Sequence, residues 1–181
     1  MNASEYFIEL AKVLNSLDPD ETDRCASIIF EYINSEKKIM TCGNGGSAFT
    51  ASHYVTDWVK APKTEKDRRL NVISLSDNTG LLTAYANDMD YENIFSEQIS
   101  VYGNIGDLVV FVSGSGNSKN IINAINVAKA AGLRTMAVVG YDGGQLKQLA
   151  DFSFHVPSFN MQICEDLHLM FGHIVVNRLV K

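Results

Sequence analysis

Cysteine is scarce in this sequence, and its spacing does not suit cross-links. Only 3 cysteines occur in 181 residues, and no two of them form a C-x-x-C pair. An odd count without paired spacing argues against a disulfide framework and against a structural zinc site built from cysteines. We therefore interpret Cys25, Cys42 and Cys164 as small buried side chains in a reducing compartment.

Clusters of positive charge are also absent. No run of Lys or Arg is longer than two residues and the formal net charge is −6, so the chain offers no basic face to a nucleic-acid backbone. The N-terminal segment mixes Glu5, Glu9 and Lys12 into its apolar residues, which indicates neither a signal peptide nor a membrane anchor. We expect a cytoplasmic protein whose partners include neither nucleic acid nor a membrane.

The residues that are present suit one globular domain. With 46% hydrophobic and 20% charged residues, the chain can bury one sizeable core, and we predict a single domain over residues 1–181. Apolar residues at helical spacing predict a helical pair within 1–35. Its second helix begins at Asp18 and Pro19, an N-cap followed by a proline in the first turn.

From residue 38 onward, short apolar runs alternate with helical stretches. The predicted strands cover residues 38–42, 71–75, 108–112, 135–140 and 152–156. A long helix closes the chain, and the polar stretch 60–69 is expected to be an exposed loop. Strands separated by helices of about 10–15 residues indicate crossover units. We therefore predict an α/β fold with a five-stranded parallel, doubly wound sheet over 38–181.

Two turns rich in glycine and serine follow predicted strands. They are GNGGS at 43–47 and SGSGNS at 113–118. In parallel α/β sheets, ligands bind outside the carboxyl ends of the strands. Glycine lets the backbone approach a ligand closely, and free N–H groups at a helix start bind anions together with hydroxyl donors. A phosphorylated or otherwise polar ligand is therefore favoured over two merely tight connecting turns, with Ser47, Ser113, Ser115 and Ser118 as the natural phosphate ligands.

Nucleotide-binding motifs fit these turns poorly. The Walker pattern G-x-x-x-x-G-K-[ST] is absent. Gly43, Gly45 and Ala48 satisfy G-x-G-x-x-A, but the acidic partner is expected about 20 residues on. Such a partner at the end of the next strand is not clearly present, since Asp77 follows Gly46 by about 30 residues. We rank a dinucleotide below a sugar phosphate and expect no nucleotide cofactor.

Two pairs of polar residues on predicted helices could carry chemistry. His53 and Asp57 are four residues apart, so both can point to one ligand, although a solvated histidine on a surface helix would show the same spacing. Glu165 and His173 on the last helix lie about 80° apart around its axis. His168 is an alternative ligand, more simply read as a hydrogen-bonded interface histidine. The wide apolar surface of this helix suggests burial against another subunit.

Taken together, these motifs resemble the sugar isomerase (SIS) domain family and, within it, the phosphoheptose (sedoheptulose-7-phosphate) isomerase branch. The resemblance covers nearly the whole chain. It is carried by CGNGGS at 42–47, HYVTDW at 53–58, ANDMDYENIFSEQI at 86–99, SGSGNS at 113–118, VVGYDGG at 138–144, and the final helix with His168 and His173.

The resemblance implies a fold, an activity and a set of site residues. It implies a SIS-type, flavodoxin-like sheet and a homotetramer with active sites near subunit interfaces. The implied reaction interconverts sedoheptulose 7-phosphate and D-glycero-D-manno-heptose 7-phosphate through an enediol. The implied catalytic pair is Asp57 and His173. Zinc or another divalent metal would be held by His53, Asp57, Glu165 and His173. Substrate contacts carry over to Asn44, Gly45, Gly46, Ser47, Asn87, Asp88, Ser113, Ser115, Ser118 and Glu165.

Two positions depart from the family pattern. A glutamate of the family is Asp57 here, which withdraws the carboxylate by about 1.5 Å, and a misplacement of about 1 Å can cost about 100-fold in rate. A glutamine of the family is Glu165, whose charge should strengthen cation binding. Two alternatives therefore stay open: a non-catalytic tetrameric adaptor that binds a replication initiator, and an isomerase for another sugar phosphate. The retained acid and imidazole groups favour an enzyme.

Overall fold

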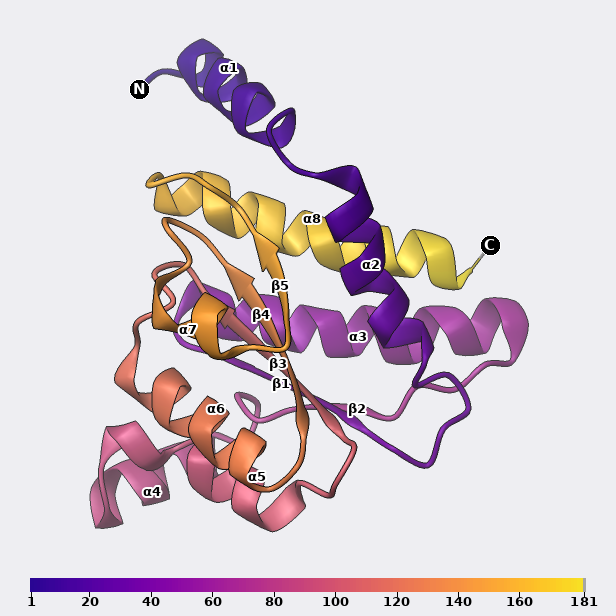
Figure 1. Cartoon of the computed structure of the whole chain (residues 1–181), viewed down its shortest axis with the longest axis vertical. Helices are drawn as coiled ribbons and strands as arrows, with labels where there is room; N and C mark the ends of the chain where they lie inside the picture. Colours follow the sequence, from indigo (N-terminus) through magenta and orange to yellow (C-terminus); the bar gives the residue numbers. More distant parts are fainter. Residues whose placement is uncertain (181) are drawn as a thin grey trace.

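A five-stranded parallel sheet forms the centre of the computed structural model (Figure 1), which describes residues 1–180 and, for 63–66, the backbone alone. The strands are β1 (Ile39–Gly43), β2 (Val72–Ser74), β3 (Leu108–Ser113), β4 (Arg134–Val139) and β5 (Phe152–His155). Their order in the sheet is β2-β1-β3-β4-β5, and every neighbouring pair is parallel. All five strands coincide with predicted ones, so the α/β class is confirmed.

Helices cover both faces of this sheet. They are α1 (Ala3–Leu14), α2 (Pro19–Phe30), α3 (Gly46–Lys66), α4 (Thr79–Asp88), α5 (Ser96–Tyr102), α6 (Lys119–Ala130), α7 (Gly144–Leu149) and α8 (Met161–Leu179), with a short 3₁₀ helix η1 (Tyr91–Asn93). Residues of α2, α3 and α8 share one apolar core, and residues of α5, α6 and α7 share the other. Figure 1 shows these two groups on opposite sides of the sheet. The sheet is therefore doubly wound, as predicted.

The central strand explains how one sheet supports two cores. Every residue of β3 is buried, and successive side chains point to opposite faces. Leu108, Val110 and Val112 belong to the core with α3 and α8, whereas Val109 and Phe111 belong to the other. An unbroken apolar run is what a parallel strand covered on both faces requires.

The N-terminal helical pair is confirmed, and its two members differ in packing. The side chain of Asp18 caps α2 by accepting from the Asp20 and Glu21 amides, and α2 contributes to the core. Helix α1 stands away from the sheet (Figure 1). Its apolar residues Phe7 and Ile8 are 67% and 69% exposed. This helix presents an apolar surface that the described residues leave uncovered.

Residues 60–69 are a correction to the sequence prediction. The structure continues α3 to Lys66 and ends it at Asp67, which has a left-handed backbone (φ 50°). The polar composition of this stretch indicated exposure correctly for Asp67 and Arg69. Polarity does not end a helix, however, because Lys, Glu and Ala are good helix formers. No helix of the described residues is both long and apolar enough to cross a membrane.

The wide apolar surface of α8 is explained in large part by packing within the chain. We expected it to be buried by another subunit, yet much of it is buried within the chain. Ile163, Leu167, Phe171 and Val175 lie in the core shared with α2 and α3. Helix α8 contacts α3, α2 and β4, so it packs along several sides and needs apolar residues around much of its circumference.

Candidate active site

A small cavity lies where the two predicted turns meet. Strands β1 and β3 are neighbours, but the helices that follow them, α3 and α6, lie on opposite faces. This arrangement is the topological switch point at which α/β sheets bind ligands. The cavity measures about 180 Å³, and its lining residues are Asn44, Ser47, Val112, Ser113, Gly114, Ser115, Ser118, Met161 and Glu165. The structure thus brings together both small-residue turns and Glu165.

Glycines make the close approach in this cavity possible. Gly45 precedes α3 as its N-cap, with a positive φ of 54° and no side-chain cap, so the amides of Gly46 and Ser47 remain available to an anion. A Cβ on Gly46 would lie 2.4 Å from Oε1 of Glu165. Gly45 and Gly46 therefore shape the turn through their backbone, as expected for a cradle that admits a bound group.

The serine hydroxyls are arranged to donate. The Gly116 amide donates to Oγ of Ser113 at 3.1 Å, and the Asn117 amide donates to Oγ of Ser115 at 3.3 Å. A hydroxyl that accepts from the backbone keeps its own hydrogen free for another acceptor. Since Ser113 lines the cavity and is only 5% exposed, that hydrogen can be offered to a ligand oxygen.

Asn87 and Asp88 do not join this group. They occupy the last turn of α4, are exposed, and do not line the cavity. The Asn87 side-chain amide donates to Oδ1 of Asp88 at 2.8 Å. The resemblance implies that both residues contact the substrate. In the described residues of a single chain, they do not reach the cavity.

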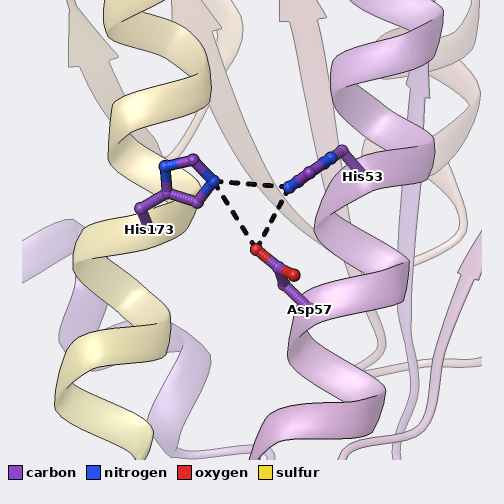
Figure 2. A group of neighbouring side chains, drawn as sticks. All are labelled: His53, Asp57 and His173. Carbon is purple, nitrogen blue, oxygen red and sulfur yellow. Dashed lines mark hydrogen bonds and ion pairs between the residues drawn. The ribbon is translucent and has the colours of Figure 1, made fainter.

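A second group of functional side chains lies further along α3. His53 and Asp57 on α3 face His173 on α8 (Figure 2). Nε2 of His53 lies 3.2 Å from Oδ2 of Asp57 and 3.3 Å from Nε2 of His173. Nε2 of His173 lies 3.7 Å from the same carboxylate oxygen. Three groups from two helices therefore converge on one point.

Buried neighbours bring these two helices together. Trp58 follows Asp57 and donates its indole N–H to the Gly172 carbonyl at 3.2 Å, and the Tyr54 hydroxyl donates to the His168 carbonyl. A Cβ on Gly172 would lie 2.4 Å from the Tyr54 ring. Because only a glycine admits the ring at this distance, α8 approaches α3 closely and His173 reaches the pair on α3.

The three-residue group has the dimensions of a metal site. In a tetrahedral zinc site with bonds of about 2.0–2.1 Å, two ligand atoms lie about 3.3 Å apart. The three separations of 3.2, 3.3 and 3.7 Å are close to that value. Two imidazoles and a carboxylate are also a donor set that catalytic zinc uses, with a fourth position left for water or substrate. The residues present therefore fit a divalent metal.

Glu165 lies outside this three-residue group, so its place in the predicted four-residue metal shell stays a prediction. The group of mutually close ligand atoms contains His53, Asp57 and His173. Glu165 and His173 are eight residues apart, so about 12 Å of helix rise separates them along α8. The Glu165 carboxylate lies against Gly46 at the start of α3.

His168 is not an alternative ligand in this structure. It is 1% exposed, and burial lowers its pKa from 6.5 to about 4, so the ring is neutral. The expected hydrogen-bonded interface histidine is thus a buried residue of the chain's own core.

Two residues beside the cavity were missed by the sequence prediction. The Tyr91 hydroxyl donates to Oδ1 of Asn44 at 2.9 Å, and Asn120 pairs with the same side chain. Tyr91 lies within the motif at 86–99, and Asn120 follows the last residue of the motif at 113–118 by two positions. Their polarity was visible in the sequence, but nothing local indicated that they meet Asn44.

Comparisons with known proteins agree with this geometry. The family model described as SIS domain matches residues 5–140. The chain belongs to the SIS domain family. Among its relatives is a phosphoheptose isomerase of Aliarcobacter butzleri, 36% identical over 92% of this chain and 87% of the relative. Another, from Helicobacter pylori, is 38% identical over 92% of this chain and 85% of the relative.

A solved structure extends the likeness to three dimensions. The phosphoheptose isomerase of Neisseria gonorrhoeae superposes with a TM-score of 0.88 at 27% identity, over 97% of this chain and 95% of that one. The resemblance drawn from the motifs, to the phosphoheptose isomerase branch of the SIS family, is confirmed. So is the expectation that this SIS protein is an isomerase.

Proposed function

We propose that this SIS protein is an aldose–ketose isomerase that interconverts sedoheptulose 7-phosphate and D-glycero-D-manno-heptose 7-phosphate through an enediol. The observation that carries the proposal is the convergence of His53, Asp57 and His173 on one point, further along the helix α3 that begins at the serine-lined cavity. The relatives named phosphoheptose isomerase support the substrate class.

The spacing along α3 suits a substrate of this length. Helix rise places His53 about 9 Å and Asp57 about 15 Å beyond Ser47. In an extended heptulose 7-phosphate, seven bonds separate C2 from phosphorus and span about 9 Å. A phosphate at the start of α3 would therefore leave C1 and C2 near the histidines and the carboxylate. A triose phosphate is too short to bridge the two groups in this way.

Each residue has a role that its position supports. The serines and the free amides of α3 hold the phosphate. Oδ2 of Asp57 faces the histidines, while its other oxygen is turned aside (Figure 2) and can move a proton between C1 and C2. While its Nε2 is free of metal, His173 can exchange protons with the substrate oxygens. A divalent metal held by His53, Asp57 and His173 would, when bound, stabilise negative charge on those oxygens.

A homotetramer would complete the site. The side chains of His53 and His173 are 45% and 49% exposed, whereas proton abstraction from carbon benefits from a site that excludes water. We propose that other copies of the chain cover this face, and the apolar surface of α1 is available for association. Light scattering on the purified protein checks the tetramer. The cytoplasmic location stays a prediction.

Isomerisation can be tested directly. Purified protein is incubated with sedoheptulose 7-phosphate, first metal-free and then with zinc, and aldose formation is followed by NMR. We expect turnover that Asp57→Ala and His173→Ala abolish. No turnover in either condition, from an intact oligomer, would contradict the proposal and favour a different sugar phosphate or a binding role.

A further inference from the structure

Asn44 lies in the first small-residue turn, and its side chain is held by two other elements. Its Oδ1 accepts from the Tyr91 hydroxyl and from Nδ2 of Asn120, each at 2.9 Å. Its Nδ2 donates to Oδ1 of Asn120, also at 2.9 Å. Asn120 is 2% exposed in the first turns of α6. The turn after β1, helix α6 and η1 thus meet at one amide.

These bonds decide what Asn44 can offer to a ligand. A carboxamide has two acceptor lone pairs and two N–H donors. Tyr91 and Asn120 occupy both lone pairs, and Asn120 takes one donor. One N–H remains, on a side chain that lines the cavity. Asn44 therefore presents a single N–H donor to the cavity. This donor can bind a phosphate oxygen, but it cannot bind a ligand group that is itself a donor.

Tyr91 is itself held firmly, although it is 57% exposed. The neighbouring Glu92 accepts from Nζ of Lys119 at 2.9 Å through its side chain. Asn123 donates to the Glu92 carbonyl at 3.1 Å and to Oδ1 of Asn93 at 3.0 Å. Helix α6 therefore holds η1 through Glu92 and Asn93, the two residues that follow Tyr91.

From this network we propose that Tyr91 is a positioning residue for the phosphate cavity. It orients the Asn44 amide, and through it the turn 43–47, without touching the substrate. The inference rests on the proposed function for its catalytic readout. Because the reacting carbons lie at His53, Asp57 and His173, loss of the phenol should weaken phosphate binding and leave the chemical step nearly unchanged.

The test compares Tyr91→Phe with Tyr102→Phe, which removes an exposed hydroxyl at the end of α5. One lost hydrogen bond should raise KM for the sugar phosphate, and Ki for inorganic phosphate, by about three- to tenfold. We expect kcat to stay within about twofold. In an Asn44→Ala background, Tyr91→Phe should add no further change, because the phenol acts through that amide.

A second readout does not depend on activity. In the ligand-free protein, Tyr91→Phe should speed hydrogen exchange at the amides of 43–47, and Tyr102→Phe should not. Unchanged exchange and unchanged KM in an active enzyme would overturn the positioning role and leave the isomerase standing. Faster exchange in a protein that never turns over the sugar would support the positioning role and contradict the proposed function.

Discussion

Gly172→Ala tests whether the approach of α8 to α3 builds the three-residue group. The added Cβ would lie 2.4 and 2.5 Å from two carbons of the Tyr54 ring, about 1 Å short of an ordinary contact. The Tyr54 ring has no free space to move into, since it is buried and stacks on the Trp58 ring with the two ring centroids 4.6 Å apart. Relief therefore requires the helices to separate. We expect a net loss of about 1–2 kcal/mol, because overpacking costs about 1–3 kcal/mol and alanine returns up to 1 kcal/mol of helix propensity.

The larger consequence should be catalytic. His173 follows Gly172 directly, so a shift of about 1 Å moves it away from His53 and Asp57, and a misplacement of this size can cost about 100-fold in rate. Thermal unfolding, zinc affinity and kcat are measured beside Gly80→Ala in α4, whose Cβ meets only the Asn78 side chain, at 3.2 Å. A Gly172→Ala variant that keeps wild-type kcat and zinc affinity would refute the argument that this helix contact sets the site.

The remaining predictions concern the metal and pH. Zinc titration by calorimetry should show that binding is lost in His53→Ala. In Glu165→Gln the zinc affinity should change by less than about threefold, since three ligands make the group. Loss of zinc binding in Glu165→Gln would instead support the four-residue shell. The same Glu165→Gln substitution should increase the affinity for inorganic phosphate severalfold, because it removes a negative charge from the cavity. Weaker phosphate binding would show that the carboxylate assists binding of the anion. Burial lowers the pKa of His168 to about 4, so the unfolded chain binds more protons between pH 4 and 6.5, and about 3 kcal/mol of stability should be lost as pH falls through that window. In urea unfolding, the stability of His168→Phe should depend less steeply on pH than that of the wild type. An identical pH dependence would exclude His168 as the source of the lost stability.

Local patterns in the sequence were enough to predict the framework of the site. Alternating apolar runs and helical stretches indicated all five strands, and the small-residue turns came where β1 and β3 end. The spacing of His53 and Asp57 put both on one side of α3. These features depend on backbone periodicity and on glycine at sharp turns, which neighbouring residues determine.

Packing between distant segments decided the rest. Only the folded chain shows that His173 meets the pair on α3 while Glu165 reaches the cavity, because the axial register of α8 against α3 depends on Tyr54, Trp58 and Gly172. The same holds for Tyr91 and Asn120 at Asn44. The sequence determined which residues share a turn or a helix face. The tertiary structure decided which faces meet and how far along each helix they meet, since that register is set by side chains of α3 that bind backbone carbonyls of α8 more than 100 residues away.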